Sequence, residues 1–278
     1  QPPTLRQLKD WLYRGRQTDE EAEVAAYSAT EIFGRKDFTH FSATELDAIT
    51  AVLHRFARLL YREEHRRRVR TPRSGTIDLR RSIRDNLARG GDLDYFRWCR
   101  PKRSRQRITI FCDVSKSMEL YSQFLLRFLY GFHRTGVKLE AFVFSTSLTR
   151  LTPVLARQDQ EASLRQLADL VPQWSGGTDL GRSLRAFREA YGRRYLGRKT
   201  TVIVLSDGWD QGDAVVMDHQ LRFVRKNCRE LVWINPLAGR PGFVPRTRGM
   251  VTALPYVDYL TSAHNLETLV ELVRHLAR

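Results

Sequence analysis

The 278-residue chain has few cysteines and no long hydrophobic run. Its three cysteines, Cys99, Cys112 and Cys228, are widely spaced and form no CxxC pair, so neither a disulfide framework nor a cysteine zinc site is expected. No uninterrupted apolar stretch approaches the roughly 18 residues that are typical of a membrane span. The N-terminus lacks the basic and then apolar pattern of a secretory signal. These absences favour a cytoplasmic protein with reduced thiols.

The chain also lacks the sequence patterns of several enzyme classes. Its seven histidines form no HExxH motif or other zinc-ligand pair. Ser115 stands in no G-x-S-x-G turn, and neither it nor Ser117 has an assignable histidine base, which argues against a serine hydrolase. Residues 192–200 come near a phosphate-binding P-loop, but they have one residue too many before the lysine and lead from a helix into a strand. We therefore expect a protein that is not an enzyme.

Acidic residues are few relative to basic ones. The chain has 31 Asp and Glu against 47 Lys and Arg, which gives a net charge of +16. The excess is concentrated in Arg62–Arg105, whereas residues 1–50 are slightly acidic. Such a charge attracts an acidic protein surface, nucleic acid or anionic lipid, although a solvated helix end and linker would have the same composition. Few aromatic residues accompany Arg66–Arg70, which makes base stacking less favoured.

The hydrophobic content of 42% is sufficient for one large domain with a smaller module. Residues 1–90 are expected to form an α-helical N-terminal module. Its expected helices lie at 4–13 and 19–34, and a further one begins at Ser42, where Ser42 and Glu45 make a capping box. The same module ends with an expected helix at Ile77–Arg89, which two glycines follow. Residues 91–106 are expected to be a basic connector, with Asp94–Trp98 as a candidate edge strand.

Strands and helices alternate from residue 107 to residue 278. This alternation predicts an α/β fold with a doubly wound, mostly parallel sheet that helices cover on both faces. A short antiparallel hairpin is expected at one edge of the sheet. The expected strands are Arg107–Cys112, Lys138–Ser145, Leu148–Thr152, Thr201–Ser206 and Leu231–Asn235, with a shorter one near Gly249–Ala253. The expected helices lie at about 118–135, 160–171, 180–194, 213–228 and 265–277.

Three of the loops in this part of the chain have oxygen-bearing side chains. Asp113, Ser115 and Ser117 follow the first strand, Thr178 precedes a helix, and Asp207 follows the fourth strand. Open parallel sheets bind their ligands at the carboxyl ends of the strands, so these side chains are expected to converge. Hard oxygen ligands suit Mg²⁺ or Mn²⁺. The alternative for the first loop is a helix N-cap that uses one of the serines.

This ordered set of residues resembles the metal-ion-dependent adhesion site (MIDAS) of von Willebrand factor A (VWA) domains, over roughly residues 107–278. In that family the two serines and the threonine usually contact the metal, while the two aspartates act mainly through bound water. The resemblance therefore implies Ser115, Ser117 and Thr178 as direct ligands of Mg²⁺ or Mn²⁺. It implies Asp113 and Asp207 as outer-shell residues of the same metal site.

Further motifs lie outside the MIDAS, at Ser74–Arg81, Arg89–Gly91, Val232–Leu237 and Ala253–Asp258. With these motifs the chain more closely resembles the CoxE-like VWA proteins. Members of that group are generally encoded with MoxR-type AAA+ ATPases and are implicated in the maturation of metalloenzymes, such as molybdenum-containing carbon monoxide dehydrogenase. The resemblance thus implies a MoxR-type ATPase and an acidic client protein as partners.

Five further residues on these loops have open interpretations. Lys116 stands where many VWA relatives have glycine, and we expect its side chain to point into water. Asp179 is expected to cap the helix that follows it. Asp210 lies either at the rim of the metal face or in a solvated turn. Trp174 and Trp209 either anchor a partner or pack against the loops that carry them.

The sequence as a whole predicts a divalent-metal-dependent protein-binding module, in which a carboxylate of the partner completes the coordination of the metal. The main alternative is a basic nucleic-acid-binding protein that uses the VWA fold as a scaffold. A purely structural domain with an empty site is the third possibility.

Overall fold

The structure is a computed structural model. The part of the chain that it describes comprises residues 64–72, 74–89, 95–103, 107–118, 137–156, 177–262 and 264–276, with the single residues 92, 121, 129 and 133. The expected helices at 4–13, 19–34 and 160–171 and the helix beginning at Ser42 lie outside the described residues, as does most of the helix expected at 118–135. Within the described ranges, none of the helices combines the length and the apolar character that a membrane crossing requires.

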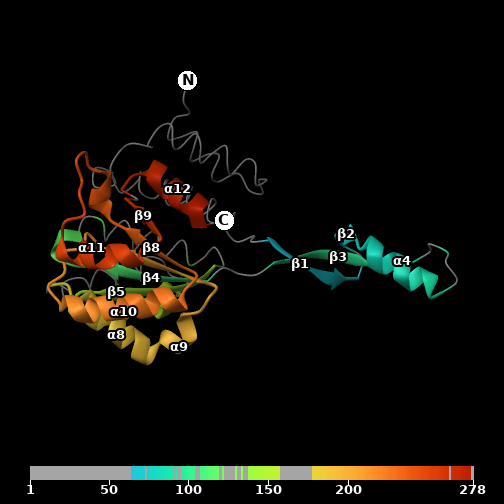
Figure 1. The fold of residues 1–278 in the computed structure, drawn as a ribbon, viewed down its shortest axis with the longest axis horizontal. Helices are drawn as coiled ribbons and strands as arrows, with labels where there is room; N and C mark the ends of the chain where they lie inside the picture. Colours follow the sequence, from blue (N-terminus) through green and yellow to red (C-terminus); the bar gives the residue numbers. More distant parts are fainter. Residues whose placement is uncertain are drawn as a thin grey trace, which may run out of the picture. The chain divides into compact units, whose positions relative to one another are not determined.

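The chain divides into two compact units, one of which is Arg62–Arg105 (Figure 1). The other contains Gln106–Arg278 and Gln1–Tyr61. The bounds of the smaller unit differ from the expected division into residues 1–90 and 91–106.

The smaller unit combines a three-stranded antiparallel sheet with one helix (Figure 1). Strand β3 lies in the middle of the sheet and pairs with both β1 and β2. Gly75, in the turn between β1 and β2, has a φ of +106°, and a Cβ atom there would clash with the carbonyl oxygen of Cys99. The elements of this unit are β1 (Glu64–Thr71), β2 (Thr76–Ile77), α4 (Leu79–Leu87) and β3 (Trp98–Arg103).

The smaller unit agrees only in part with the prediction. The helix expected at Ile77–Arg89 is confirmed as α4, which begins after Asp78 because the Asp78 carboxylate accepts a hydrogen bond from the Arg81 N–H. The strand expected at Asp94–Trp98 lies later, at Trp98–Arg103. Strand β1 was not expected, since its run of arginines shows no alternation of apolar and polar residues. Backbone pairing with β3 forms this strand in the absence of that signal.

The larger unit is built on a six-stranded sheet with the strand order β6-β5-β4-β7-β8-β9. All neighbouring strands are parallel except β6, which pairs antiparallel with β5 at the edge. The predicted mostly parallel sheet and its edge hairpin are therefore confirmed. The strands are β4 (Arg107–Asp113), β5 (Lys138–Phe144), β6 (Leu148–Arg150), β7 (Thr200–Leu205), β8 (Glu230–Ile234) and β9 (Tyr259–Thr261).

Helices cover both faces of this sheet, and Figure 1 shows α12 on the opposite side from α8 and α10. Phe187 of α8 packs its ring edge against Phe111 of β4 and Phe142 of β5, with ring centroids 4.8 and 5.1 Å apart. The helices are α6 (Thr152–Leu155), α8 (Leu180–Ala190), α9 (Gly192–Tyr195), α10 (Ala214–Asn227), α11 (Arg248–Ala253) and α12 (Leu266–Leu276). Shorter 3₁₀ turns are η2 (Lys116–Met118), η4 (Pro236–Gly239) and η5 (Leu254–Tyr256).

One predicted strand of this unit is wrong. The segment Gly249–Ala253 lies in helix α11, and the last strand of the sheet is β9 instead. Met250 and Ala253 are buried three residues apart, which is helical spacing, but in so short an apolar run the period does not distinguish a helix from a strand.

The register of the strands places their carboxyl ends along one edge of the sheet. Asp113 at the end of β4 pairs with Phe144 at the end of β5, and Cys112 pairs with Leu205 at the end of β7. The residues that follow these strands are therefore neighbours in space, although they are far apart in the sequence. This edge is where the sequence predicts the metal site.

Candidate metal centre

Asp113 is the residue on which three loops converge. Its carboxylate is fully buried, and its Oδ1 accepts a hydrogen bond from the backbone N–H of Ser115 at 2.9 Å. The same oxygen accepts the hydroxyl of Thr178 at 3.3 Å, and Oδ2 accepts the hydroxyl of Ser206 at 2.7 Å. Side chains from the loops after β4 and β7 and from the loop before α8 are thus held on one carboxylate.

The two serines of the first loop bring their hydroxyls together. Ser115 Oγ lies 3.2 Å from Ser117 Oγ, because the turn η2 folds the chain back at this point. Ser115 is buried and Ser117 is exposed, so the group of hydroxyls reaches the protein surface. The alternative of a helix cap by one of the serines is not tested, because most of the helix expected at 118–135 lies outside the described residues. Lys116 is exposed, as we expected.

Thr178 is fixed by the backbone of its neighbours on both sides. Its carbonyl oxygen accepts the N–H of Gln211 at 2.8 Å, and the N–H of Asp179 donates to the carbonyl of Ser145 at 2.8 Å. The loop before α8 is thereby attached both to the end of β5 and to the loop after β7. The Asp179 carboxylate accepts the N–H of Arg182 at 2.8 Å, so its predicted role as a helix cap is confirmed.

Asp207 is held in a tight turn. Its Oδ1 accepts the N–H of Trp209 at 3.0 Å, and its carbonyl accepts the side-chain amide of Asn235 at 3.1 Å. Gly208 has a φ of +81°, and a Cβ atom there would clash with Met250 and lie 2.7 Å from Thr247 Oγ1. Only glycine fits this turn without strain.

The Asp210 carboxylate accepts hydrogen bonds from two backbone N–H groups. Its Oδ2 accepts the N–H of Leu180 at 2.7 Å and its Oδ1 accepts the N–H of Gly212 at 2.9 Å. Burial raises the pKa of this carboxyl, while the two backbone hydrogen bonds oppose that effect. Asp210 therefore connects the loop after β7 to the first turn of α8. Trp209 beside it is 66% exposed, and Trp174 lies outside the described residues.

Two buried carboxylates lie close to one another in this site. Burial raises the pKa of Asp113 to about 6, the hydrogen bonds from Ser206 and Ser115 oppose this, and the charge of Asp207 raises the pKa further. Burying negative charge is costly unless a positive charge compensates it.

The chemistry of the donors fits a hard divalent cation. Within the described part of the chain, no three His, Cys, Asp or Glu side chains are grouped for a metal, so a cation here would depend on the hydroxyls as well as on the two acids. Hydroxyl and carboxylate oxygens are ligands that Mg²⁺ and Mn²⁺ accept. The arrangement thus brings together Asp113, Ser115, Ser117 and Thr178, with Asp207 next to them.

Sequence reasoning missed Ser206. Its hydroxyl donates to Asp113 and accepts the N–H of Gly208 at 3.0 Å, while its carbonyl accepts the indole N–H of Trp233 at 2.9 Å. Its position in the sequence, directly after a buried strand and before Asp207, could have indicated that it belongs to the site.

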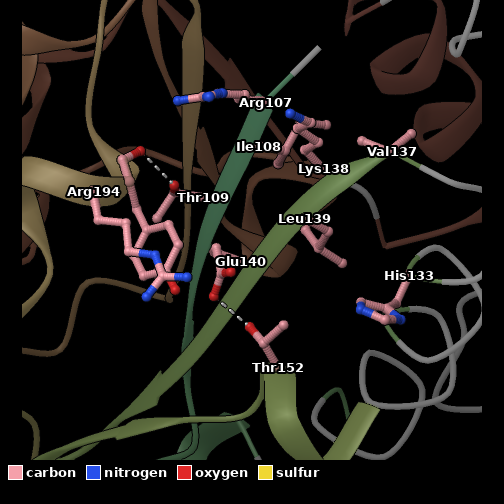
Figure 2. A pocket seen from close by; sticks show the side chains of 11 residues that line it. Arg107, Ile108, Thr109, His133, Val137, Lys138, Leu139, Glu140, Thr152 and Arg194 are labelled. Atoms are coloured by element: carbon pink, nitrogen blue, oxygen red, sulfur yellow. Dashed lines mark hydrogen bonds between the residues drawn. The ribbon is translucent and has the colours of Figure 1, made fainter. Parts of the chain in front are cut away.

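A separate cavity of about 440 Å³ lies at the opposite ends of the strands (Figure 2). Arg107 and Lys138, which begin β4 and β5, line it, so it is about 20 Å along β4 from Asp113. Glu140 in this cavity accepts hydrogen bonds from Arg150 at 3.0 and 3.1 Å and from Thr152 at 2.8 Å. None of the five predicted site residues lines this cavity.

Comparison with solved structures gives distant similarities. A proximal thread matrix protein from the mussel byssus is 21% identical over 62% of this chain and 48% of that chain, with a TM-score of 0.43. A von Willebrand factor type A protein from Catenulispora acidiphila is 16% identical over 64% and 43%, with a TM-score of 0.40. An aerotolerance-related membrane protein from Bacteroides fragilis is 12% identical over 62% and 98%, with a TM-score of 0.40.

The chain spans about half the length of the mussel protein it matches. All three TM-scores are below 0.5. None of the curated proteins compared with the chain matches it. The family described as VWA domain containing CoxE-like protein matches residues 49–269, which is most of the chain. On this match, and with the fold described above, the chain belongs to the family of CoxE-like proteins that contain a VWA domain.

Proposed function

We propose that this protein is a divalent-metal-dependent protein-binding module. The observation that carries the proposal is the convergence of three loops on the buried Asp113 carboxylate, which gathers the hydroxyls of Ser115, Ser117 and Thr178 at one edge of the sheet. These three hydroxyls would hold Mg²⁺ or Mn²⁺. Asp113 and Asp207 would orient the site and balance its charge, mainly through bound water.

In this proposal the residues of the chain bind and orient, and they catalyse no reaction. When bound, the cation supplies positive charge and a coordination position for a carboxylate of the partner. Ser206 keeps the Asp113 carboxylate in place, and Asp210 and Gln211 fix the loops that surround it. The exposed Ser117 marks the side from which a partner side chain would approach.

The partner we propose is a MoxR-type AAA+ ATPase, together with an acidic client protein whose metal centre the complex matures or remodels in the cytoplasm. Membership of the CoxE-like family supports this choice. The charge of the chain supports an acidic partner, because residues 62–105 contain fifteen Lys and Arg against six Asp and Glu, which is +9 of the total of +16.

The test is affinity capture of a purified MoxR-type ATPase by the full chain, with Mg²⁺ and then with a chelator. We expect capture by the wild type only with the metal. We expect loss of capture in Ser117→Ala, which removes an exposed hydroxyl that lies 3.2 Å from that of Ser115. Ser147→Ala is the matched control, because Ser147 is an exposed serine on the β5–β6 hairpin and only its carbonyl is used. Equal capture under all conditions would exclude the metal-dependent model.

Nucleic-acid binding is a second candidate, which the +9 charge of residues 62–105 favours. Its signature is binding of a labelled RNA or DNA that weakens steeply with salt and is unchanged by Ser117→Ala. Binding with that signature, in the absence of ATPase capture, would replace the first proposal.

A further inference from the structure

Helix α4 of the smaller unit buries polar residues and exposes aliphatic ones, which is the reverse of a usual amphipathic helix. Its buried residues are polar, since Ser82 is 1% exposed and Asn86 is 2% exposed. Its aliphatic residues point outward, with Leu79 65%, Ile83 47% and Leu87 68% exposed. The three aliphatic side chains are four residues apart, so they form one continuous row along the helix. We call this row the α4 stripe.

Hydrogen bonds fix this orientation. The Ser82 hydroxyl donates to the Asp78 carbonyl at 2.9 Å and accepts the N–H of Arg97 at 2.9 Å. The Asn86 side chain donates to the Tyr95 carbonyl at 2.7 Å and accepts the Tyr95 N–H at 3.1 Å. Turning the α4 stripe inward would break the three bonds to Tyr95 and Arg97 and leave buried polar groups unpaired. The hydrogen bonds of Ser82 and Asn86 therefore keep the α4 stripe exposed to solvent.

An exposed apolar row of this kind can contribute favourable free energy to the binding of a partner. Covering an exposed Leu or Ile side chain removes apolar surface from water and so favours binding, and solvent-facing helix positions are normally polar. Contiguous exposed apolar residues on a soluble domain are typical of interaction surfaces. The α4 stripe thus has the character of a contact surface for another polypeptide.

The charges beside the stripe indicate the chemistry of the partner. Arg80 and Arg84 each follow a stripe residue in the sequence, so they form a second row next to it, also with a spacing of four. Both are exposed, and among the described residues neither pairs with a carboxylate, whereas Asp85 pairs with Arg97 and Asp78 with Arg81. An apolar row flanked by a row of cations is complementary to a helix with an apolar stripe and acidic residues beside it.

We propose that the α4 stripe binds an amphipathic, acidic helix of a partner protein. The apolar side chains of that helix cover Leu79, Ile83 and Leu87, and its Glu or Asp side chains pair with Arg80 and Arg84. Nucleic acid offers no apolar surface for the stripe. An anionic membrane would take the same charges but sets no helical spacing, so the two parallel rows favour a facing helix. The surface is independent of the metal centre.

The test uses the full chain and a synthetic helical peptide that has leucines at heptad a and d positions with glutamates beside them, labelled for fluorescence anisotropy. A control peptide replaces the leucines by serine. We expect the wild type to bind only the first peptide, whether or not a chelator is present. The double variants Ile83→Ser/Leu87→Ser and Arg80→Glu/Arg84→Glu should each bind about tenfold more weakly or worse.

Val251→Ser is the matched control, since Val251 is a similarly exposed aliphatic residue on helix α11 of the other unit. It should bind like the wild type, and circular dichroism should show all variants folded. Equal binding by the stripe variants and the wild type would overturn the proposal. Binding to phosphatidylglycerol vesicles that the same variants abolish, without binding to the peptide, would assign the stripe to a membrane and overturn it as well.

Discussion

The hydroxyl of Ser206 donates a 2.7 Å hydrogen bond to Asp113 Oδ2, which joins the end of β7 to the end of β4. The two residues are 93 positions apart in the sequence, yet both are buried at the same edge of the sheet. The bond sets the orientation of the carboxylate around which the other site residues are arranged.

Ser206→Ala should therefore weaken metal binding as well as stability. The variant leaves Asp113 Oδ2 without its donor in a buried place, which should lower the free energy of unfolding by about 1–3 kcal/mol. Isothermal titration with Mg²⁺ or Mn²⁺ should show a weaker affinity than the wild type.

Thr201→Val on β7, the strand that Ser206 follows, is the control for this variant. The Thr201 hydroxyl is buried and has no hydrogen-bond partner among the described residues, so its removal should leave stability unchanged or raised. If Ser206→Ala behaves like Thr201→Val in both measurements, the Ser206 bond has no role in the site.

Gly208→Ala should strongly destabilise the fold. The substitution forces a side chain into a left-handed turn at a φ of +81° and against Met250 and Thr247. We expect a loss of about 3 kcal/mol or more in the free energy of unfolding, measured in urea.

Gly242→Ala separates the two causes of this loss. Gly242 has a φ of +76°, but a Cβ atom there would meet nothing within 4 Å, so only the backbone cost of about 1 kcal/mol applies. Equal losses in the two glycine variants would show that the contact with Met250 is unimportant.

Addition of Mg²⁺ or Mn²⁺ should raise the melting temperature of the wild type. A cation that binds only the folded chain stabilises it by about 1.4 kcal/mol at a concentration ten times its dissociation constant. Ser117→Ala should reduce this shift, and Ser147→Ala should retain it. An unchanged melting temperature in the wild type over millimolar Mg²⁺ and Mn²⁺ would argue for a structural domain without a metal.

The stability of the protein should fall at alkaline pH in part through Cys228. Burial raises the pKa of this thiol to about 11, above its value in the unfolded chain. The unfolded chain then releases the proton first, so the stabilisation is present below pH 9 and is lost as the pH rises towards 11. Urea unfolding between pH 8 and pH 10.5 should show a steeper decline for the wild type than for Cys228→Ala, and parallel curves would contradict this.

The sequence was informative where burial and spacing act together. The apolar runs that became β4 and β7 predict buried parallel strands, and the order of acids and hydroxyls after them predicts which residues meet at Asp113. The signal was absent where the chain is polar, since β1 and β3 form through backbone pairing among arginines. The position of Ser206 depends on strand register, which a single sequence does not specify.

The α4 stripe shows a related limit of pattern reading. The helix at 79–87 was predicted correctly, but an amphipathic pattern does not state which face is buried. Ser82 and Asn86 decide this through their bonds to residues 95–97, which lie on a separate segment of the chain.

The backbone links among the loops have a consequence for how readily the site could accept a ligand. The bonds from Gln211 to Thr178 and from Asp179 to Ser145 hold the three loops together as soon as the chain has folded. Most of the entropy lost in assembling the donors is thus lost during folding, and little of it would be subtracted from affinity on association. A site preorganised in this way could release one ligand and bind another without a rearrangement of its three loops.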